Sequence, residues 1–102
     1  MTAFIPPDEL DELIHERVRL GVVSALAAGV ELSFTELRDM LKVTDGNLSV
    51  HARVLEKAGY LTIEKAFVDR RPRTSLRLSA KGRQAFARYV ARLEELVKGS
   101  KT

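Results

Sequence analysis

The sequence predicts a single domain of the α+β class, mainly helical, with three helices, a two-stranded β-hairpin and a final helix. Three observations lead to this prediction. The chain has 102 residues, which is enough for one domain and no more. Its apolar residues follow a helical period as far as Gly59 and then alternate with a period of two. The helical period returns after Ser79, so the hairpin lies between helices.

The first helix is predicted over residues 8–28, because Pro6-Pro7 precede it and Gly29 suits a left-handed cap at its end. The second half of this helix is apolar on every side, so it must be covered all round, and we expect a second subunit to supply part of the cover. Gly21 costs helix stability, which a close helix–helix approach would explain. The first half is amphipathic, with an apolar face that holds Leu10, Leu13 and Ile14.

Two short helices separated by two or three residues follow, which is the arrangement of a helix-turn-helix. Ser33 and Glu36 have the spacing of a capping box, and the helix that they start runs to about Lys42. Thr44 caps the next helix, expected over about residues 45–58, and Gly59 ends it.

The hairpin is predicted from two alternating segments, residues 60–67 and 74–78, joined by a basic tip at residues 68–73. Ser79 caps the last helix, predicted over residues 80–98. The apolar residues of this helix fall within about 120° of its circumference. They are Phe86, Tyr89, Val90, Leu93, Leu96 and Val97.

Charge is distributed unevenly along the chain, although the net charge is only +3. Residues 60–83 hold seven basic and two acidic side chains, whereas residues 1–20 hold five acids and two bases. A local excess of positive charge attracts a polyanion. On charge alone, a solvated basic loop explains the excess equally well.

The third helix has an apolar side with Leu48, His51, Ala52 and Leu55, and an outward face suited to a DNA groove. On that face, Gly46 leaves room for a phosphate at the helix N-terminus. Arg53 can pair with a guanine edge, Asn47 with adenine, and Val50 can contact a thymine methyl group. An ordinary amphipathic helix with a polar outer face is the alternative interpretation.

The hairpin tip carries arginines that could reach a flanking minor groove, since narrow A·T grooves attract arginine. Pro72 stiffens the tip, and Asp69 is expected to hold the guanidinium of Arg71 in one orientation. A helix-turn-helix followed by a basic hairpin is a more specific pattern than either part alone. The tip arginines are Arg70, Arg71 and Arg73.

Four segments resemble the winged helix-turn-helix transcriptional regulators of the MarR and ArsR groups. Residues 47–51 and 55–60 resemble the recognition helix, Asp69-Arg70-Arg71 the wing motif, and residues 78–83 the junction between the wing and the last helix. The resemblance covers about residues 10–97. It implies a three-helical core, a hairpin wing over about residues 67–74 and a C-terminal dimerisation helix.

The resemblance further implies a homodimer that binds double-stranded DNA and regulates transcription, here as a repressor, with residues 45–58 in the major groove. The expected DNA contacts are Thr44, Gly46, Asn47, Ser49, Val50, Arg53, Lys57, Arg70, Arg71 and Arg73. The expected dimer interface is formed by the terminal helices, residues 8–28 and 80–98, through Leu10, Leu13, Ile14, Phe86, Tyr89, Val90, Leu93, Leu96 and Val97.

Other functions have less support in the sequence. The chain has no cysteine, which excludes thiol chemistry and the metal-sensing role of some regulators of the MarR and ArsR groups. No metal or cofactor site is predicted. No constellation of nucleophile, base and orienting group predicts an enzyme. His51 is expected to be a packed, hydrogen-bonded residue, and His15 a lone surface histidine. No export signal or membrane span is predicted, so we expect a cytoplasmic protein.

One alternative remains open: a winged helix that binds another protein and has no sequence preference for DNA. The sequence leaves undecided the operator, the choice between activation and repression, and the existence of a small-molecule effector.

Overall fold

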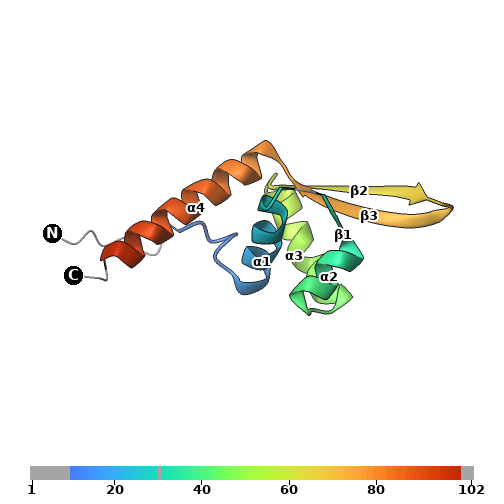
Figure 1. The fold of residues 1–102 in the computed structure, drawn as a ribbon, viewed down its shortest axis with the longest axis horizontal. Helices are drawn as coiled ribbons and strands as arrows, with labels where there is room; N and C mark the ends of the chain where they lie inside the picture. The colour runs from blue at the N-terminus through green and yellow to red at the C-terminus, as the bar shows by residue number, and fades with distance from the viewer. Residues whose placement is uncertain (1–9, 30, 100–102) are drawn as a thin grey trace.

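The computed structural model describes residues 10–29 and 31–99, and it confirms the mainly helical α+β class (Figure 1). The molecule is elongated, 60 × 25 × 21 Å, with the last helix projecting at one end and the hairpin at the other. The elements in chain order are α1 (Arg17–Ala27), β1 (Leu32–Ser33), α2 (Phe34–Leu41), α3 (Asp45–Lys57), β2 (Leu61–Val68), β3 (Arg71–Leu78) and α4 (Ala80–Gly99).

Helix α1 begins at Arg17, so the prediction of a helix through residues 10–16 is wrong. The predicted start at Asp8 lies outside the described residues. The carboxylate of Asp11 accepts hydrogen bonds from the amides of Leu13 and Ile14, which holds this segment in turns that compete with a helix. Glu16 then caps α1 by accepting from the amide of Arg19 at 2.8 Å.

Most of the all-apolar half of α1 is covered by the chain itself, so three of its four apolar residues need no second subunit, and Leu20 is half-buried. Val22, Val23 and Leu26 are each 0% exposed. Gly21 lies where α1 meets α2, since a β-carbon built there would be 2.8 Å from Cδ2 of Leu41. The close helix–helix approach suggested by Gly21 is therefore confirmed.

The sheet has three antiparallel strands in the order β1-β3-β2, and the sequence pattern does not predict β1. This strand has two residues, Leu32 and Ser33, too few to show a period, and they pair with Leu76 and Ser75. Ser33 then caps α2 through the predicted capping box with Glu36, which is confirmed.

The hairpin is tighter than predicted, because its strands meet in a two-residue turn, Asp69-Arg70, rather than a six-residue tip. Both turn residues have positive φ, 52° and 66°, as a type I′ hairpin turn requires. Arg71 and Pro72 consequently lie within β3. Proline is tolerated there because β1 reaches only Ser75 and Leu76, so the outer edge of β3 is unpaired at Pro72.

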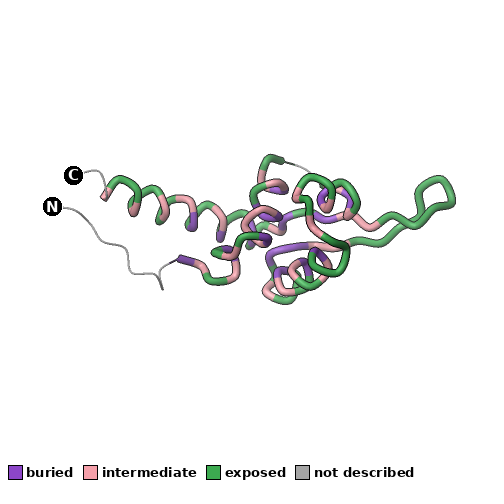
Figure 2. The backbone as a smooth tube through the Cα atoms, turned by 90° about the horizontal axis from the view of Figure 1, so that it is seen from below, coloured by how far each residue is buried: buried purple, intermediate pink, exposed green. Residues whose placement is uncertain are grey.

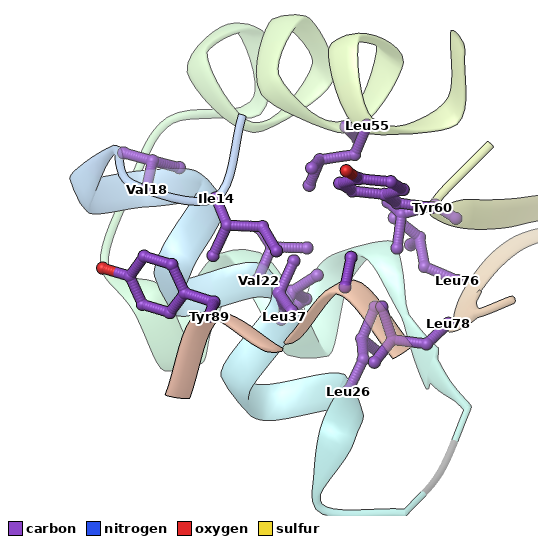
Figure 3. Close-up of a cluster of buried hydrophobic side chains, with 14 of the residues drawn as sticks. Ile14, Val18, Val22, Leu26, Leu37, Leu55, Tyr60, Leu76, Leu78 and Tyr89 are labelled. Carbon is purple, nitrogen blue, oxygen red and sulfur yellow. The ribbon is translucent and has the colours of Figure 1, made fainter. Parts of the chain in front are cut away.

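The core lies where α1, α2, α3, the base of the hairpin and the start of α4 converge (Figure 3). The hairpin tip and much of the far half of α4 are exposed (Figure 2). In the part of the chain that the structure describes, no helix combines the length and apolar character needed to span a membrane. The largest fully buried side chains are Ile14, Leu26, Leu37, Leu48, Leu55, Leu76, Val22 and Val23.

Candidate nucleic-acid interface

Helix α3 presents one face to the core and the other to solvent, as its sequence pattern predicts. Leu48, Ala52 and Leu55 are buried. Opposite them, the side chains expected to contact DNA are accessible, and Val50 is 61% exposed although it is apolar. The exposed members of this face are Thr44, Gly46, Asn47, Val50, Arg53 and Lys57, and Ser49 is half-buried.

The start of α3 is held by two polar contacts. The hydroxyl of Thr44 accepts from the amide of Asn47 at 3.1 Å, which is the predicted cap. Arg38 on α2 donates to Asp45 at 2.7 Å across the turn. Hydrogen bonds to Asp45 and Asp39 raise the pKa of Arg38. Arg38 thereby offsets an acidic charge beside the exposed face of α3, a role that a single sequence does not reveal.

The opposite edge of α3 is tied to α1 through His51. Nη1 of Arg19 lies 2.9 Å from Nδ1 of His51, and Oε1 of Glu16 lies 3.5 Å from the same nitrogen. Arg19 also donates through Nε to the carbonyl oxygen of Leu13 at 2.6 Å. His51 is half-buried and hydrogen-bonded, as predicted, and it fixes how α3 lies against the core.

The arginines of the hairpin differ in their surroundings. Arg70 lies in the turn, and Arg71 is exposed at the start of β3. Arg73 donates to Glu36 at 3.3 Å, so it joins the hairpin to the start of α2. Within residues 10–29 and 31–99 no ion pair joins Asp69 to Arg71, which contradicts the expected orientation of Arg71, because Asp69 lies in the turn itself.

A cleft of about 600 Å³ separates α3 from the base of the hairpin. Its lining is partly apolar and also holds three charged side chains. Arg53 from α3 and Lys65 from β2 are basic, and Glu56 from α3 is acidic. The cleft therefore joins the exposed face of α3 to the hairpin along one side of the molecule. The lining residues are Phe34, Ser49, Ala52, Arg53, Glu56, Ile63, Lys65, Thr74 and Leu76.

Three residues expected at a dimer interface are instead buried in the core of the single chain: Leu10, Ile14 and Tyr89. His15 is exposed, as expected, but it is not alone, because its Nδ1 lies 2.7 Å from the hydroxyl of Tyr89. Burial raises the pKa of Tyr89. The remaining predicted residues are accessible: Leu13, Phe86, Val90, Leu93 and Leu96 are half-buried, and Val97 is 47% exposed.

The described part of the chain contains no cluster of three or more histidine, cysteine, aspartate or glutamate side chains that could hold a metal ion. On this side of the molecule, an exposed helix face, a basic hairpin and the cleft between them lie next to one another.

Comparisons with known proteins agree with this description. A family model described as a winged helix DNA-binding domain matches residues 18–97. The chain is 30% identical over 87 residues to the uncharacterized protein MJ0432 of Methanocaldococcus jannaschii, covering 85% of this chain and 95% of that protein.

Among solved structures, a transcriptional regulator homologue from Pyrococcus horikoshii OT3 is 29% identical, with a TM-score of 0.85, and the match covers 90% of this chain and 91% of that one. A MarR-like transcriptional regulator from Thermotoga maritima is 27% identical, with a TM-score of 0.60, over 79% of this chain and 57% of that one.

Proposed function

Because this chain belongs to the family of winged helix DNA-binding domains, we propose that it is a transcriptional regulator that binds specific sequences of double-stranded DNA. It acts in the cytoplasm as a homodimer, and it represses transcription by occupying its operator. In this proposal α3 is the recognition helix and the β2–β3 hairpin is the wing. No chemical step is required.

The observation that carries the proposal is that α3 and the wing flank one cleft and leave it open to solvent. A duplex lying along this side would meet both elements at once. Arg53 and Lys65 place positive charge on opposite walls of the cleft, where a phosphate strand would pass between the major and minor grooves.

Base contacts come from the exposed face of α3. Arg53 is placed to form a bidentate pair with guanine, Asn47 to read adenine, and Val50 to contact a thymine methyl group. The amides at the start of α3, where Gly46 has no side chain, receive a phosphate. Thr44, Ser49 and Lys57 supply further contacts around them, and Arg70, Arg71 and Arg73 contact the flanking backbone.

The homodimer forms through α4, whose far half projects from the body of the molecule (Figure 1). An apolar strip there stays partly accessible, since Val90 and Leu93 are half-buried and Val97 is 47% exposed, and these three residues line a shallow groove on it. Phe86 and Leu96 lie on the same strip, and Leu13 lies beside the core. Pairing α4 with its counterpart presents two copies of α3 to successive major grooves about 34 Å apart.

Selection of bound fragments from random duplexes tests this proposal. We expect recovered sequences to share a two-fold symmetric motif whose half-sites lie about one helical turn apart. Titration of mixed genomic DNA at two salt concentrations is the control for non-specific binding. Weak binding with no sequence preference would contradict the proposal and favour a winged helix that binds a protein through α3.

A further inference from the structure

The wing carries an apolar pair that the proposed contacts do not use. Phe67 is 78% exposed, the highest exposure among the large apolar side chains that the structure describes. In the register of the hairpin it lies directly opposite Pro72, one step from the turn. Cross-strand partners share a face of the sheet, so Phe67 and Pro72 form one apolar surface at the end of the wing.

This apolar pair lies on the side of the wing that faces the cleft. Alternate residues along a strand share a face, which places Phe67 with Lys65 and Pro72 with Thr74. Lys65 and Thr74 line the cleft together with residues of α3. The face that packs on the core at Leu76 thus continues outwards past the cleft and ends in Phe67 and Pro72.

The charges around the pair identify the chemistry of its partner. The nine residues around the turn, 65–73, contain four basic side chains and one acid, Asp69. An apolar tip surrounded by cations fits a surface that is anionic at its rim and less polar inside. The minor groove of a duplex has this character, with phosphates along both rims and sugars and base edges within.

We propose that Phe67 and Pro72 form a wedge that enters the minor groove beside the site read by α3 and partly unstacks one base step. Apolar side chains inserted in this way bend a duplex, which lets it follow more protein surface. The wedge favours flexible pyrimidine–purine steps, because these unstack at least cost. This inference rests on the proposed function. It adds a sequence preference at the unstacked base step, which arises without a hydrogen bond to a base edge.

The test uses the full chain and the tightest duplex recovered from the random selection. We expect Phe67→Ala to weaken binding about tenfold or more at every salt concentration, because a large apolar contact is lost. The slope of log affinity against log salt stays unchanged, since no phosphate contact is removed. Phe67→Leu keeps an apolar wedge and retains most of the affinity. Val68→Ala, on the opposite face of the same strand, is the matched control and leaves the affinity unchanged.

A direct readout comes from 2-aminopurine placed at successive positions in the flanks of that duplex. Saturating wild-type protein raises the fluorescence at one flanking step per half-site, and saturating Phe67→Ala does not. Equal affinity and equal fluorescence for the two proteins would overturn the wedge and leave the regulator proposal intact. A wild-type chain with no preference among duplexes would instead overturn the regulator proposal itself.

Two further measurements distinguish the wedge from a damaged fold and from a tip that binds lipid. The exposure of Phe67 predicts that Phe67→Ala leaves the unfolding free energy unchanged, so weaker DNA binding cannot come from a damaged fold. Vesicles of phosphatidylglycerol test a lipid surface as the partner. If Phe67→Ala loses binding to these vesicles but keeps its affinity for the duplex, the wedge is wrong and the tip binds membranes.

Discussion

Gly82 on α4 lies against the backbone of Tyr60, so closely that a β-carbon built at Gly82 would overlap the carbonyl oxygen of Tyr60. This contact sets where α4 leaves the wing, because the same carbonyl oxygen accepts from the amide of Ser79 at 3.0 Å. The hydroxyl of Ser79 caps α4 through the amide of Gly82 at 3.0 Å. The contacts at Tyr60 therefore fix both the direction of α4 and the position of the wing.

Gly82→Ala is expected to destabilise the protein by about 1–3 kcal/mol, because the methyl group forces the backbone of Tyr60 or α4 to shift. Gly46→Ala is the matched control. Gly46 is also helical but has no atoms near its β-position, so alanine there is expected to stabilise α3 by up to about 1 kcal/mol. Urea unfolding measures both changes, and a Gly82→Ala protein as stable as the wild type would contradict the assigned contact.

Arg53→Ala is expected to relax the preference at one base pair of each half-site by about 1–3 kcal/mol, since a bidentate contact is lost. Arg53→Lys keeps the charge but cannot form the same paired hydrogen bonds, so it retains the salt dependence and loses the preference. Competition between duplexes that differ at single positions measures the effect. An unchanged preference at all positions would remove Arg53 from the reading face.

Arg71→Ala is expected to weaken binding to all DNA sequences to a similar extent, because it removes one phosphate contact. For the same reason, the slope of log affinity against log salt falls by about one unit. Arg73→Ala provides the comparison, as Arg73 is paired with Glu36 in the free protein. We expect a smaller change for Arg73→Ala, since DNA must compete with that carboxylate. Titrations at several salt concentrations decide the matter, and an Arg71→Ala protein with unchanged affinity and slope makes the wing assignment wrong.

Val97→Glu is expected to convert the proposed dimer into 11.4 kDa monomers, because it places a charge in the apolar strip of α4. Ala91→Glu carries the same change on the exposed opposite face and leaves the dimer intact. Sedimentation at micromolar concentration distinguishes the species. A wild-type protein that sediments only as a monomer would count against the dimer proposal before any variant is made.

Tyr60→Phe tests a pH-dependent contact that holds residues 10–16 against the hairpin. Burial and the hydrogen bond that its hydroxyl donates to Asp11, at 2.5 Å, raise the pKa of Tyr60 to about 12. The folded state thus favours the neutral phenol. The resulting stability is fully present below about pH 10, the ordinary pKa of tyrosine, and is lost as pH rises through about 12.

We therefore expect Tyr60→Phe to lower the unfolding free energy at pH 7 by about 1–3 kcal/mol, as a hydrogen bond to a charged group is lost. The gap between the two proteins narrows as the pH rises from 10 to 12. Denaturant unfolding at several pH values measures this gap. A gap that stays constant to pH 12 would show that ionisation of Tyr60 is not linked to folding.

Local signals in the sequence predicted most elements correctly. Ser33 with Glu36, and Thr44 with the amide of Asn47, mark helix starts through contacts spanning three residues, and both caps are present. Apolar periodicity placed Leu48, Ala52 and Leu55 in the core and left Arg53 outside. The resemblance to winged helix-turn-helix regulators is confirmed by the family match over residues 18–97.

Other features required contacts between distant residues. The two-residue strand β1 exists because Leu32 and Ser33 pair with Leu76 and Ser75, more than forty positions away. The side chains of Arg73 and Glu36, 37 positions apart, also meet. The helical pattern of residues 10–16 was overridden by the carboxylate of Asp11, which binds local amides and Tyr60 at once.

From the sequence alone came the order of the elements other than β1, the caps of α2, α3 and α4 and the buried faces of these helices, because these depend on neighbours within about one helical turn. The tertiary structure decided which apolar residues complete the core of one chain, where α1 begins, and which way the wing turns its aromatic tip. These depend on packing and pairing across the fold, where the competing conformations have similar local energies and only long-range contacts separate them.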